Sequence, residues 1–313
     1  MKKAFAVQAA CAALAAVAGL AIAAGEGPLA EARQRPPQIR VQTTLVNIVA
    51  SVSDASGEPI AGLPQEAFAL TEEGVPQKIA RFEPETNRPL DLVLMVDSSA
   101  SALVELKLEL EAAAQFIGRV LRPGDTLAVF EFSDDVTELA DFSGDVPRLQ
   151  AAVRHVSPGS GTSMYDALVL GSSALRRRPA DRRRAIVLVT DAGETTSKSQ
   201  FEDARRGAVV SEALVYSVIV RPVKNENGRN TAGEHALITI EESAGGGAFI
   251  LDDVSQIGAI FDRINRELRT QYLLGYYPNP TPPPGSLRHV GLQVTGGYAV
   301  HYRSEYFTAR APR

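Results

Sequence analysis

The sequence predicts an α/β protein with a doubly wound, mostly parallel sheet and a small β-rich unit built from the two flanks. Between residues 90 and 270, short continuous apolar runs alternate with longer amphipathic stretches. This alternation is typical of parallel strands covered by helices on both faces. On both sides of this region, at 38–86 and 271–308, short alternating segments are separated by turn signals, which predicts strands that pack together.

The first 24 residues have the pattern of a secretory signal peptide. Lys2 and Lys3 precede a run rich in Ala, Leu and Val, and Ala21-Ile22-Ala23 is a small-x-small cleavage signal. An uncleaved membrane anchor is the alternative, although the run is only weakly hydrophobic. Residues 25–37 form a predicted flexible lead-in. We therefore expect an exported protein, periplasmic or secreted, with no stable membrane span after cleavage.

Length and composition exclude several classes of protein. A chain of 313 residues can hold one large domain and a smaller partner unit. Its single cysteine, Cys11, lies in the signal segment, so the mature chain has neither a disulfide nor a thiol site. The formal net charge of −5 argues against nucleic-acid binding.

The N-terminal flank, 38–86, is predicted to be all β. Residues 39–53 alternate in part between apolar and polar side chains, and 54–57 form a turn signal. A second strand at 68–72 runs into a turn, and 77–82 form a further strand.

The central region, 88–270, is predicted to hold six strands and six helices. In the first helix, apolar residues recur every three or four positions and form one buried face. A turn at Ser133-Asp134-Asp135 predicts a hairpin and hence an antiparallel edge strand. The predicted strands are 91–96, 126–132, 136–140, 185–190, 214–220 and 248–251, and the predicted helices are 103–121, 146–155, 163–177, 200–212, 234–243 and 256–269.

The C-terminal flank, 271–308, is predicted to pack with 38–86. It begins with a strand at 271–277, continues through a proline-rich loop, and ends in a predicted hairpin of 287–294 with 298–307. Its tyrosines favour strand packing over a ligand platform. They are Tyr272, Tyr276, Tyr277, Tyr298, Tyr302 and Tyr306.

The most informative motif is Asp97-Ser98-Ser99-Ala100-Ser101, directly after the apolar run 92–96. In an extended loop alternate side chains point the same way, so Asp97, Ser99 and Ser101 can present their oxygens to one point. Two more oxygen donors follow, Thr162 in a glycine-rich turn and Asp191 after the apolar run 185–190. Carboxylates and hydroxyls are hard ligands that suit Mg²⁺.

These residues resemble the metal-ion-dependent adhesion site (MIDAS) of a von Willebrand factor type A (vWA) domain. The family pattern is Asp-x-Ser-x-Ser, a Thr after a glycine turn and an Asp after a later strand. It is matched by Asp97, Ser99, Ser101, Thr162 and Asp191. The resemblance implies a Rossmann-like fold and a Mg²⁺ ion, with Mn²⁺ or Ca²⁺ as alternatives. It also implies a protein partner that supplies an Asp or Glu carboxylate.

Two neighbours of the motif depart from the family pattern. Ala100 and Ala192 stand where glycine is usual, and each adds a Cβ close to the loop. The flanks resemble a narrower group, the VWFA-related family first described from Acidobacteria. The matching segments are VSDASGEPIAGLPQEAFALTEEGVPQKIARF and QYLLGYYP with the strands that follow it. This resemblance covers nearly the whole mature chain, and it implies fold and export more than a biological role.

Three hypotheses for function remain open at this stage. The first is an exported interaction module that binds a partner's acid through Mg²⁺, and the second is a scaffold in an envelope complex with a purely stabilising metal. The third is a metal-assisted hydrolase, but the sequence has no HExxH, no GxSxG elbow, no Walker A loop and no convincing general base, so we predict no enzyme. A loop that only satisfies its own backbone amides is the simplest alternative for Asp97 and the serines.

Other polar residues near the motif favour structural roles. Asp166 is expected to stabilise a helix N-terminus or to bond the glycine turn. Glu194 is expected to be a solvated loop acid. The arginine-rich run 176–184 is expected to form a solvated loop at the amino-terminal edge of the sheet, which we favour over an anionic-surface anchor.

Overall fold

A computed structural model of the chain describes residues 44–84, 88–100, 102, 105–221 and 229–309. The predicted signal peptide, 1–24, and lead-in, 25–37, lie outside the described residues, as does Ser101. The precise domain boundaries therefore stay predictions.

The central sheet has six strands in the order β10-β9-β8-β5-β6-β7. Its strands are parallel except β7, which pairs antiparallel with β6 at one edge, as the turn at 133–135 predicts. Every residue of β5 is buried, as a strand with neighbours on both sides and helices on both faces must be. The strands are β5 (Leu90–Asp97), β6 (Thr126–Phe132), β7 (Val136–Ser143), β8 (Arg183–Thr190), β9 (Leu214–Val220) and β10 (Gly246–Leu251).

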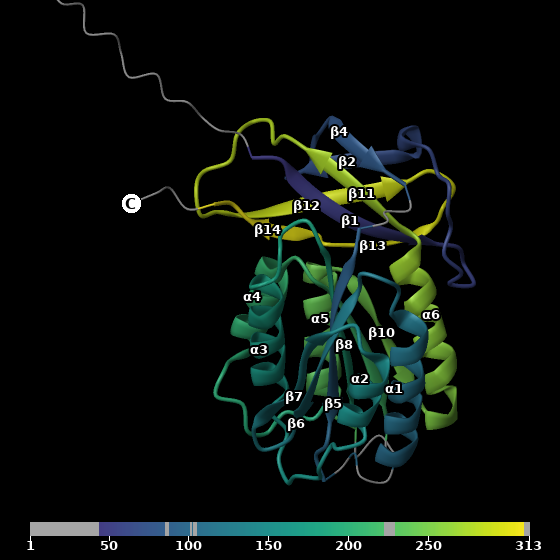
Figure 1. The fold of residues 1–313 in the computed structure, drawn as a ribbon. Coiled ribbons are helices and arrows are strands. Elements are labelled where there is room, and N and C mark those ends of the chain that lie inside the picture. Colours follow the sequence, from purple (N-terminus) through teal and green to yellow (C-terminus); the bar gives the residue numbers. More distant parts are fainter. Residues whose placement is uncertain (1–43, 85–87, 101, 103–104, 222–228, 310–313) are drawn as a thin grey trace, which may run out of the picture. The chain divides into compact units, whose positions relative to one another are not determined.

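Helices cover both faces of this sheet (Figure 1). The strand residues explain the two layers: Leu94 and Val96 belong to one apolar core, and Val93 and Met95 belong to the other. The first core is closed by α1 (Leu106–Val120), α2 (Val146–Val153) and α6 (Ile257–Arg269). The second is closed by α3 (Met164–Arg176), α4 (Phe201–Ser211) and α5 (Thr231–Ala244). The predicted doubly wound α/β class is confirmed.

The flanks form two antiparallel sheets that share a third apolar core. One sheet has the order β13-β1-β11-β4 and the other has the order β14-β12-β2-β3. Each sheet combines strands from both flanks, which confirms the predicted β-rich unit. The strands are β1 (Val46–Ser53), β2 (Phe68–Glu72), β3 (Val75–Pro76), β4 (Ile79–Glu83), β11 (Gln271–Tyr276), β12 (Leu287–Val294), β13 (Ala299–Tyr302) and β14 (Glu305–Phe307).

Tyrosines hold this third core together, as expected. Tyr272 and Tyr276 are fully buried, and Tyr306 is nearly so. The hydroxyls of Tyr276 and Tyr306 donate to the buried Glu72 carboxylate at 2.9 and 3.1 Å, and Arg288 Nε donates to it at 2.8 Å. Tyr277 is exposed and takes no part in the packing.

The predicted hairpin of 287–294 with 298–307 is confirmed only in part, because Leu287–His289 pair antiparallel with Glu305–Phe307 but 299–302 pair elsewhere. β12 pairs with β2 and β14, whereas β13 pairs with β1 in the other sheet. The chain changes sheets at Arg303, whose buried guanidinium donates to the carbonyl of Asn47 at 3.0 Å. Directly after Arg303, the carbonyl of Ser304 accepts from Val290 N of β12 at 2.7 Å. From Ser304 onward the chain therefore pairs with β12 and no longer with β1.

The arginine-rich run lies at the amino-terminal edge of the sheet, but it is not solvated throughout. Arg183 is only 6% exposed and donates through Nε to the carbonyl of Arg88 at 2.8 Å and through Nη1 to Gln271 Oε1 at 2.9 Å. Burial lowers the pKa of Arg183 to about 10. Arg182 pairs with the buried Asp91 at 2.8 Å. These arginines satisfy carbonyls and a carboxylate where the β-rich unit meets the sheet, which the charge pattern alone did not indicate.

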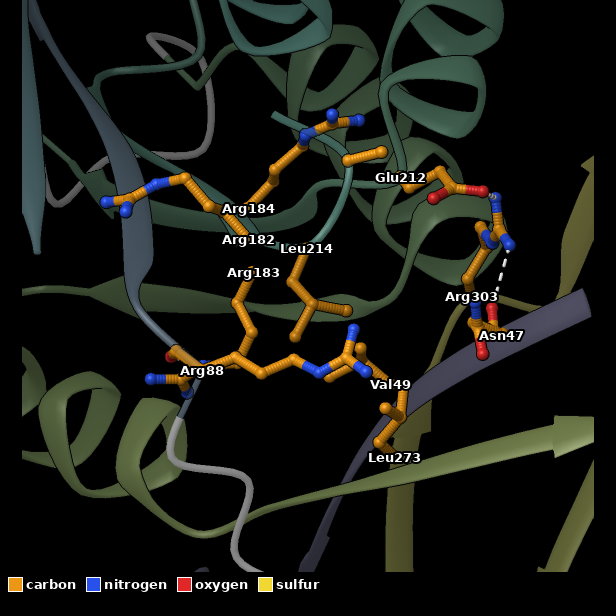
Figure 2. Close-up of a pocket in the computed structure, with 11 residues that line it drawn as sticks. Asn47, Val49, Arg88, Arg182, Arg183, Arg184, Glu212, Leu214, Leu273 and Arg303 are labelled. Atoms are coloured by element: carbon orange, nitrogen blue, oxygen red, sulfur yellow. Dashed lines mark hydrogen bonds and ion pairs between the residues drawn. The ribbon is translucent and has the colours of Figure 1, made fainter. Parts of the chain in front are cut away.

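Figure 2 shows how the arginines at this junction are arranged. The side chains of Arg182, Arg184 and Arg303 point in different directions, and a dashed line joins Arg303 to Asn47. Arg184 donates to the carbonyl of Ser211 at 2.9 Å, and Arg303 pairs with Glu212 at 3.1 Å. The cluster therefore joins elements of the fold and does not converge on one ligand position.

We predict that Arg303→Ala destabilises the protein by about 2 kcal/mol, because the buried carbonyl of Asn47 loses a charged donor. Arg119→Ala is the control. Arg119 forms an exposed pair with Asp262, and its loss should cost less than about 1 kcal/mol. Urea unfolding of both variants measures the difference, and equal losses would contradict the role given to Arg303.

Candidate metal centre

The candidate site lies at the carboxyl edge of the central sheet. Asp97 is the last residue of β5, and Asp191 directly follows β8. These strands pair in parallel with Val96 opposite Val189, so both acids emerge at the same edge. Ligands of open α/β sheets bind at this edge because the loops there surround a crevice.

Asp97 is fully buried and firmly held. Its Oδ1 accepts from Ser99 N at 2.9 Å, and its Oδ2 accepts from Thr190 Oγ1 at 2.6 Å. Burial raises the pKa of Asp97 to about 6; hydrogen bonds from Ser99 and Thr190 oppose this rise, and the nearby charge of Asp191 adds to it. The carboxylate is thus fixed in position and lacks a neutralising cation among the described residues.

The side chains of Asp191 and Thr162 both lie close to Gly193. Asp191 Oδ1 accepts from Gly193 N at 2.8 Å, whereas its buried Oδ2 has no hydrogen-bond partner among the described residues. A Cβ placed on Gly193 would lie 2.9 Å from Asp191 Oδ1 and 3.2 Å from Thr162 Oγ1. The structure therefore brings these two predicted ligands together.

Backbone hydrogen bonds join the three loops of the site. Gly159 N donates to the carbonyl of Ser98 at 2.8 Å, and Thr195 N donates to the carbonyl of Thr162 at 2.9 Å. The glycine turn is also held by Asp134, which accepts from Ser160 N at 2.8 Å and from Gly161 N at 2.9 Å. Sequence reasoning placed Asp134 only in a hairpin turn and missed this role.

Ala192 adopts the left-handed conformation, with φ of 63°. This explains why glycine is usual there, since an L side chain rarely adopts this region. The loop is supported from α5: Asn230 Nδ2 donates to the carbonyl of Asp191 at 3.1 Å. A Cβ on Gly233 would lie 1.8 Å from the Ala192 carbonyl oxygen, so the first turn of α5 packs directly against this loop.

The role expected for Glu194 needs correction, and Asp166 has a further role beside the expected one. Glu194 is not a solvated acid, because it accepts from Tyr165 N at 3.0 Å and from Ser197 Oγ at 2.8 Å. Asp166 lies in the first turn of α3, the position predicted for an acid that stabilises a helix N-terminus, and it also supports a neighbouring loop. It accepts from Lys198 N at 2.9 Å and Ser199 N at 2.8 Å, and so holds the loop that precedes α4. The sequence did not indicate the contacts of Glu194 or Asp166, because their partners Tyr165 and Lys198 are about 30 residues away in the chain.

Sequence reasoning also missed Glu109, in the first turn of α1. This side chain is 2% exposed, and its Oε2 has no hydrogen-bond partner among the described residues. Burial raises the pKa of Glu109 to about 8, with further contributions from the charges of Asp97 and Asp191. The available signal was an acid three residues after Leu106, on the apolar face of the helix.

The residues present fit a hard divalent cation. The unpartnered Oδ2 of Asp191 is a buried anionic oxygen that needs a donor or a cation. In the described parts of the chain, no three His, Cys, Asp or Glu side chains form a group that could hold a metal. The other protein donors would therefore be hydroxyls, a mixture that suits Mg²⁺. The assignment of Asp97, Ser99, Ser101, Thr162 and Asp191 as ligands stays a prediction.

The comparison with known families agrees with this architecture. The sequence profile of the von Willebrand factor type A domain matches residues 92–194, a range that spans Asp97, Thr162 and Asp191. The chain contains a vWA domain. The vWA match leaves the narrower resemblance of the flanks untested. A search of curated proteins finds no match.

Solved structures are similar to this chain at low sequence identity. A von Willebrand factor type A protein from Catenulispora acidiphila is 12% identical with a TM-score of 0.51, covering 87% of this chain and 75% of that one. The vWF domain of the type V pili tip protein Mfa5 from Porphyromonas gingivalis is 12% identical with a TM-score of 0.48, covering 58% and 96%. BatB from Bacteroides thetaiotaomicron is 15% identical with a TM-score of 0.45, covering 58% and 100%.

We predict that Gly193→Ala weakens Mg²⁺ binding at least about tenfold, because the new methyl displaces the carboxylate of Asp191 or the hydroxyl of Thr162. Gly258→Ala on α6 is the control, since a Cβ there meets nothing within 4 Å. It should leave binding unchanged. Calorimetric titration measures both variants, and undiminished binding in Gly193→Ala would contradict the predicted geometry.

We predict that, in EDTA, the stability of the wild type falls more steeply from pH 5 to pH 8 than that of Glu109→Gln. The unfolded chain releases the Glu109 proton near pH 4.3, whereas the folded chain holds it until about pH 8. Between these values the folded state binds more protons, so its stability declines as pH rises. Urea unfolding at several pH values measures the slopes, and parallel profiles would refute the shift.

Proposed function

We propose that this is an exported interaction protein whose vWA domain binds a partner protein through a divalent cation. The cation is Mg²⁺, with Mn²⁺ or Ca²⁺ as alternatives, and the partner supplies an Asp or Glu carboxylate. The observation that carries this proposal is the buried, unpartnered Oδ2 of Asp191 at the same sheet edge as the buried Asp97. Two such acids without a cation are costly to bury, and a bound metal removes that cost.

Each predicted ligand has a distinct part in the proposal. Asp97 and Asp191 supply negative charge, while Ser99, Ser101 and Thr162 supply neutral hydroxyl oxygens directly or through water. A bound Mg²⁺ ion prefers six oxygen ligands and acts as a Lewis acid toward further oxygens. Two carboxylates at most neutralise its charge, so an outside carboxylate can complete its shell.

The alternative is a scaffold protein of an envelope complex in which the metal only stabilises the fold. It is supported by the dense hydrogen bonding between the three loops, which resembles a structural site. The two functions differ in one measurable respect, since only the adhesion function requires the metal for partner binding.

Export and a non-enzymatic role complete the proposal. Export is supported by the signal-peptide pattern of residues 1–24. Within the part of the chain that the structure describes, none of the helices combines the length and apolar character needed to cross a membrane. A non-enzymatic role is supported by the acids near the centre that serve as loop supports, such as Glu194, Asp166 and Asp134.

We predict that Asp97→Ala abolishes measurable Mg²⁺ binding, because it removes a carboxylate that no described residue in its loop can replace. Ser99→Ala should weaken binding less, since the lost oxygen is neutral. Calorimetric titration gives the affinities, and circular dichroism checks that both variants fold. Undiminished binding in Asp97→Ala would place the metal elsewhere.

Partner binding is tested with the full mature chain as bait for an envelope fraction. Capture that requires Mg²⁺, fails in EDTA and fails with Asp97→Ala supports adhesion through the metal. Capture that persists in EDTA with a metal-binding wild type supports the scaffold alternative.

A further inference from the structure

Glu109 is a buried acid without a cationic partner. Most other buried acids of the described chain contact an arginine: Glu72, Asp91, Asp125, Glu234 and Glu267 pair with Arg288, Arg182, Arg269, Arg229 and Arg263. The exceptions are Asp97, Asp191, Glu109 and Glu241. Three of these exceptions interact electrostatically with one another at the carboxyl edge of the sheet.

Glu241 shows what a merely buried acid looks like in this protein. It lies in α5, and its Oε1, like Oε2 of Glu109, has no hydrogen-bond partner among the described residues. Burial raises its pKa well above the usual value, and the charge that adds to this effect comes from its own neighbour, Glu242. Glu109 differs in its place, because it lies in the first turn of α1, the helix that follows β5 and Asp97 in the chain. The charges it faces there include both acids of the candidate metal centre.

Among the described residues, the neighbours of Glu109 on α1 provide it with no cation and no hydrogen-bond donor. Leu106 and Ala113, one turn on either side, are buried in the apolar core of that sheet face. The nearby charged residue on the same helix end, Glu105, repels it. An unpaired carboxyl in such a place is costly unless a cation or an ordered water completes it.

We propose that Glu109 is an outer carboxylate beside the metal centre, which does not contact the metal itself but holds a metal-bound water and so strengthens the binding of divalent cations. This role depends on the proposed function, because it needs a metal held by Asp97 and Asp191. It adds a residue outside the Asp-x-Ser-x-Ser, Thr and Asp pattern. A second carboxylate shell of this kind orients water and raises the affinity of a site for its ion.

The test is calorimetric titration of Mg²⁺ into the full mature chain as wild type, Glu109→Gln, Glu109→Asp and Glu111→Gln. Glu109→Gln keeps the size of the side chain and removes its charge, so binding should weaken roughly 10-fold to 100-fold. Glu109→Asp keeps the charge and should retain more affinity than Glu109→Gln. Glu111→Gln changes an exposed acid of the same helix and should bind like the wild type.

Thermal melting in EDTA and in Mg²⁺ gives a second readout that does not depend on heat of binding. Without metal, Glu109→Gln should melt higher than the wild type at pH 8, because an unpaired buried charge is gone. With Mg²⁺, its gain in melting temperature should be smaller than that of the wild type.

The outcomes separate the two proposals. A wild type that binds Mg²⁺ with the same affinity as Glu109→Gln would overturn the role of Glu109 and leave the metal centre standing. A wild type that binds none of Mg²⁺, Mn²⁺ and Ca²⁺ would overturn both. Weaker binding in Glu109→Gln alone, with Glu111→Gln unchanged and circular dichroism intact, supports the role.

Discussion

The parallel pairing of β5 with β6 and β8 is the constraint on which the rest of the structure depends. Because β5 is buried along its whole length, its polar residues can lie only at its two ends. Asp91 is the second residue of the strand and Asp97 is its last, and both side chains are fully buried. At each edge of the sheet, the cost of burying a carboxylate must therefore be offset by a cation or by hydrogen-bond donors.

The two edges solve this problem in different ways. At the amino-terminal edge, Asp91 is paired with Arg178 and Arg182. Neighbouring arginines bond carbonyls there and join the β-rich unit to the sheet. At the carboxyl edge, no described arginine or lysine pairs with Asp97, Asp191 or Glu109. A site for a mobile cation is physically reasonable at the edge whose charges the chain leaves unpaired.

Rigidity at the carboxyl edge comes from residues that contribute no ligand. Asp134 holds the glycine turn, Glu194 and Asp166 hold neighbouring loops, and Gly233 lets α5 press against the Ala192 carbonyl. These supports fix three loops that converge from distant parts of the sequence. Such preorganisation is what a metal centre requires, because ligands that must reorder on binding lose affinity.

The sequence by itself determined the α/β class, the doubly wound sheet and its antiparallel edge strand. Those features follow from local periodicity, which burial on one or two faces imposes directly on the chain. It also placed Asp97, Thr162 and Asp191 at the ends of strands or in a turn, where parallel pairing brings them to one edge. Ser101 and the signal segment stay sequence predictions, since they lie outside the described residues.

Only the tertiary structure showed which partners the buried arginines and acids have. The run 176–184 looked like a solvated loop, yet Arg183 is buried, because its carbonyl partners come from residues 88 and 268. The predicted hairpin formed only where β12 meets β14, because β13 pairs with β1 in the other sheet. Asp134 was missed because its hydrogen bonds join residues distant in sequence, and Glu109 was missed because the acids near it, Asp97 and Asp191, belong to other elements. Local patterns carry no record of such neighbours.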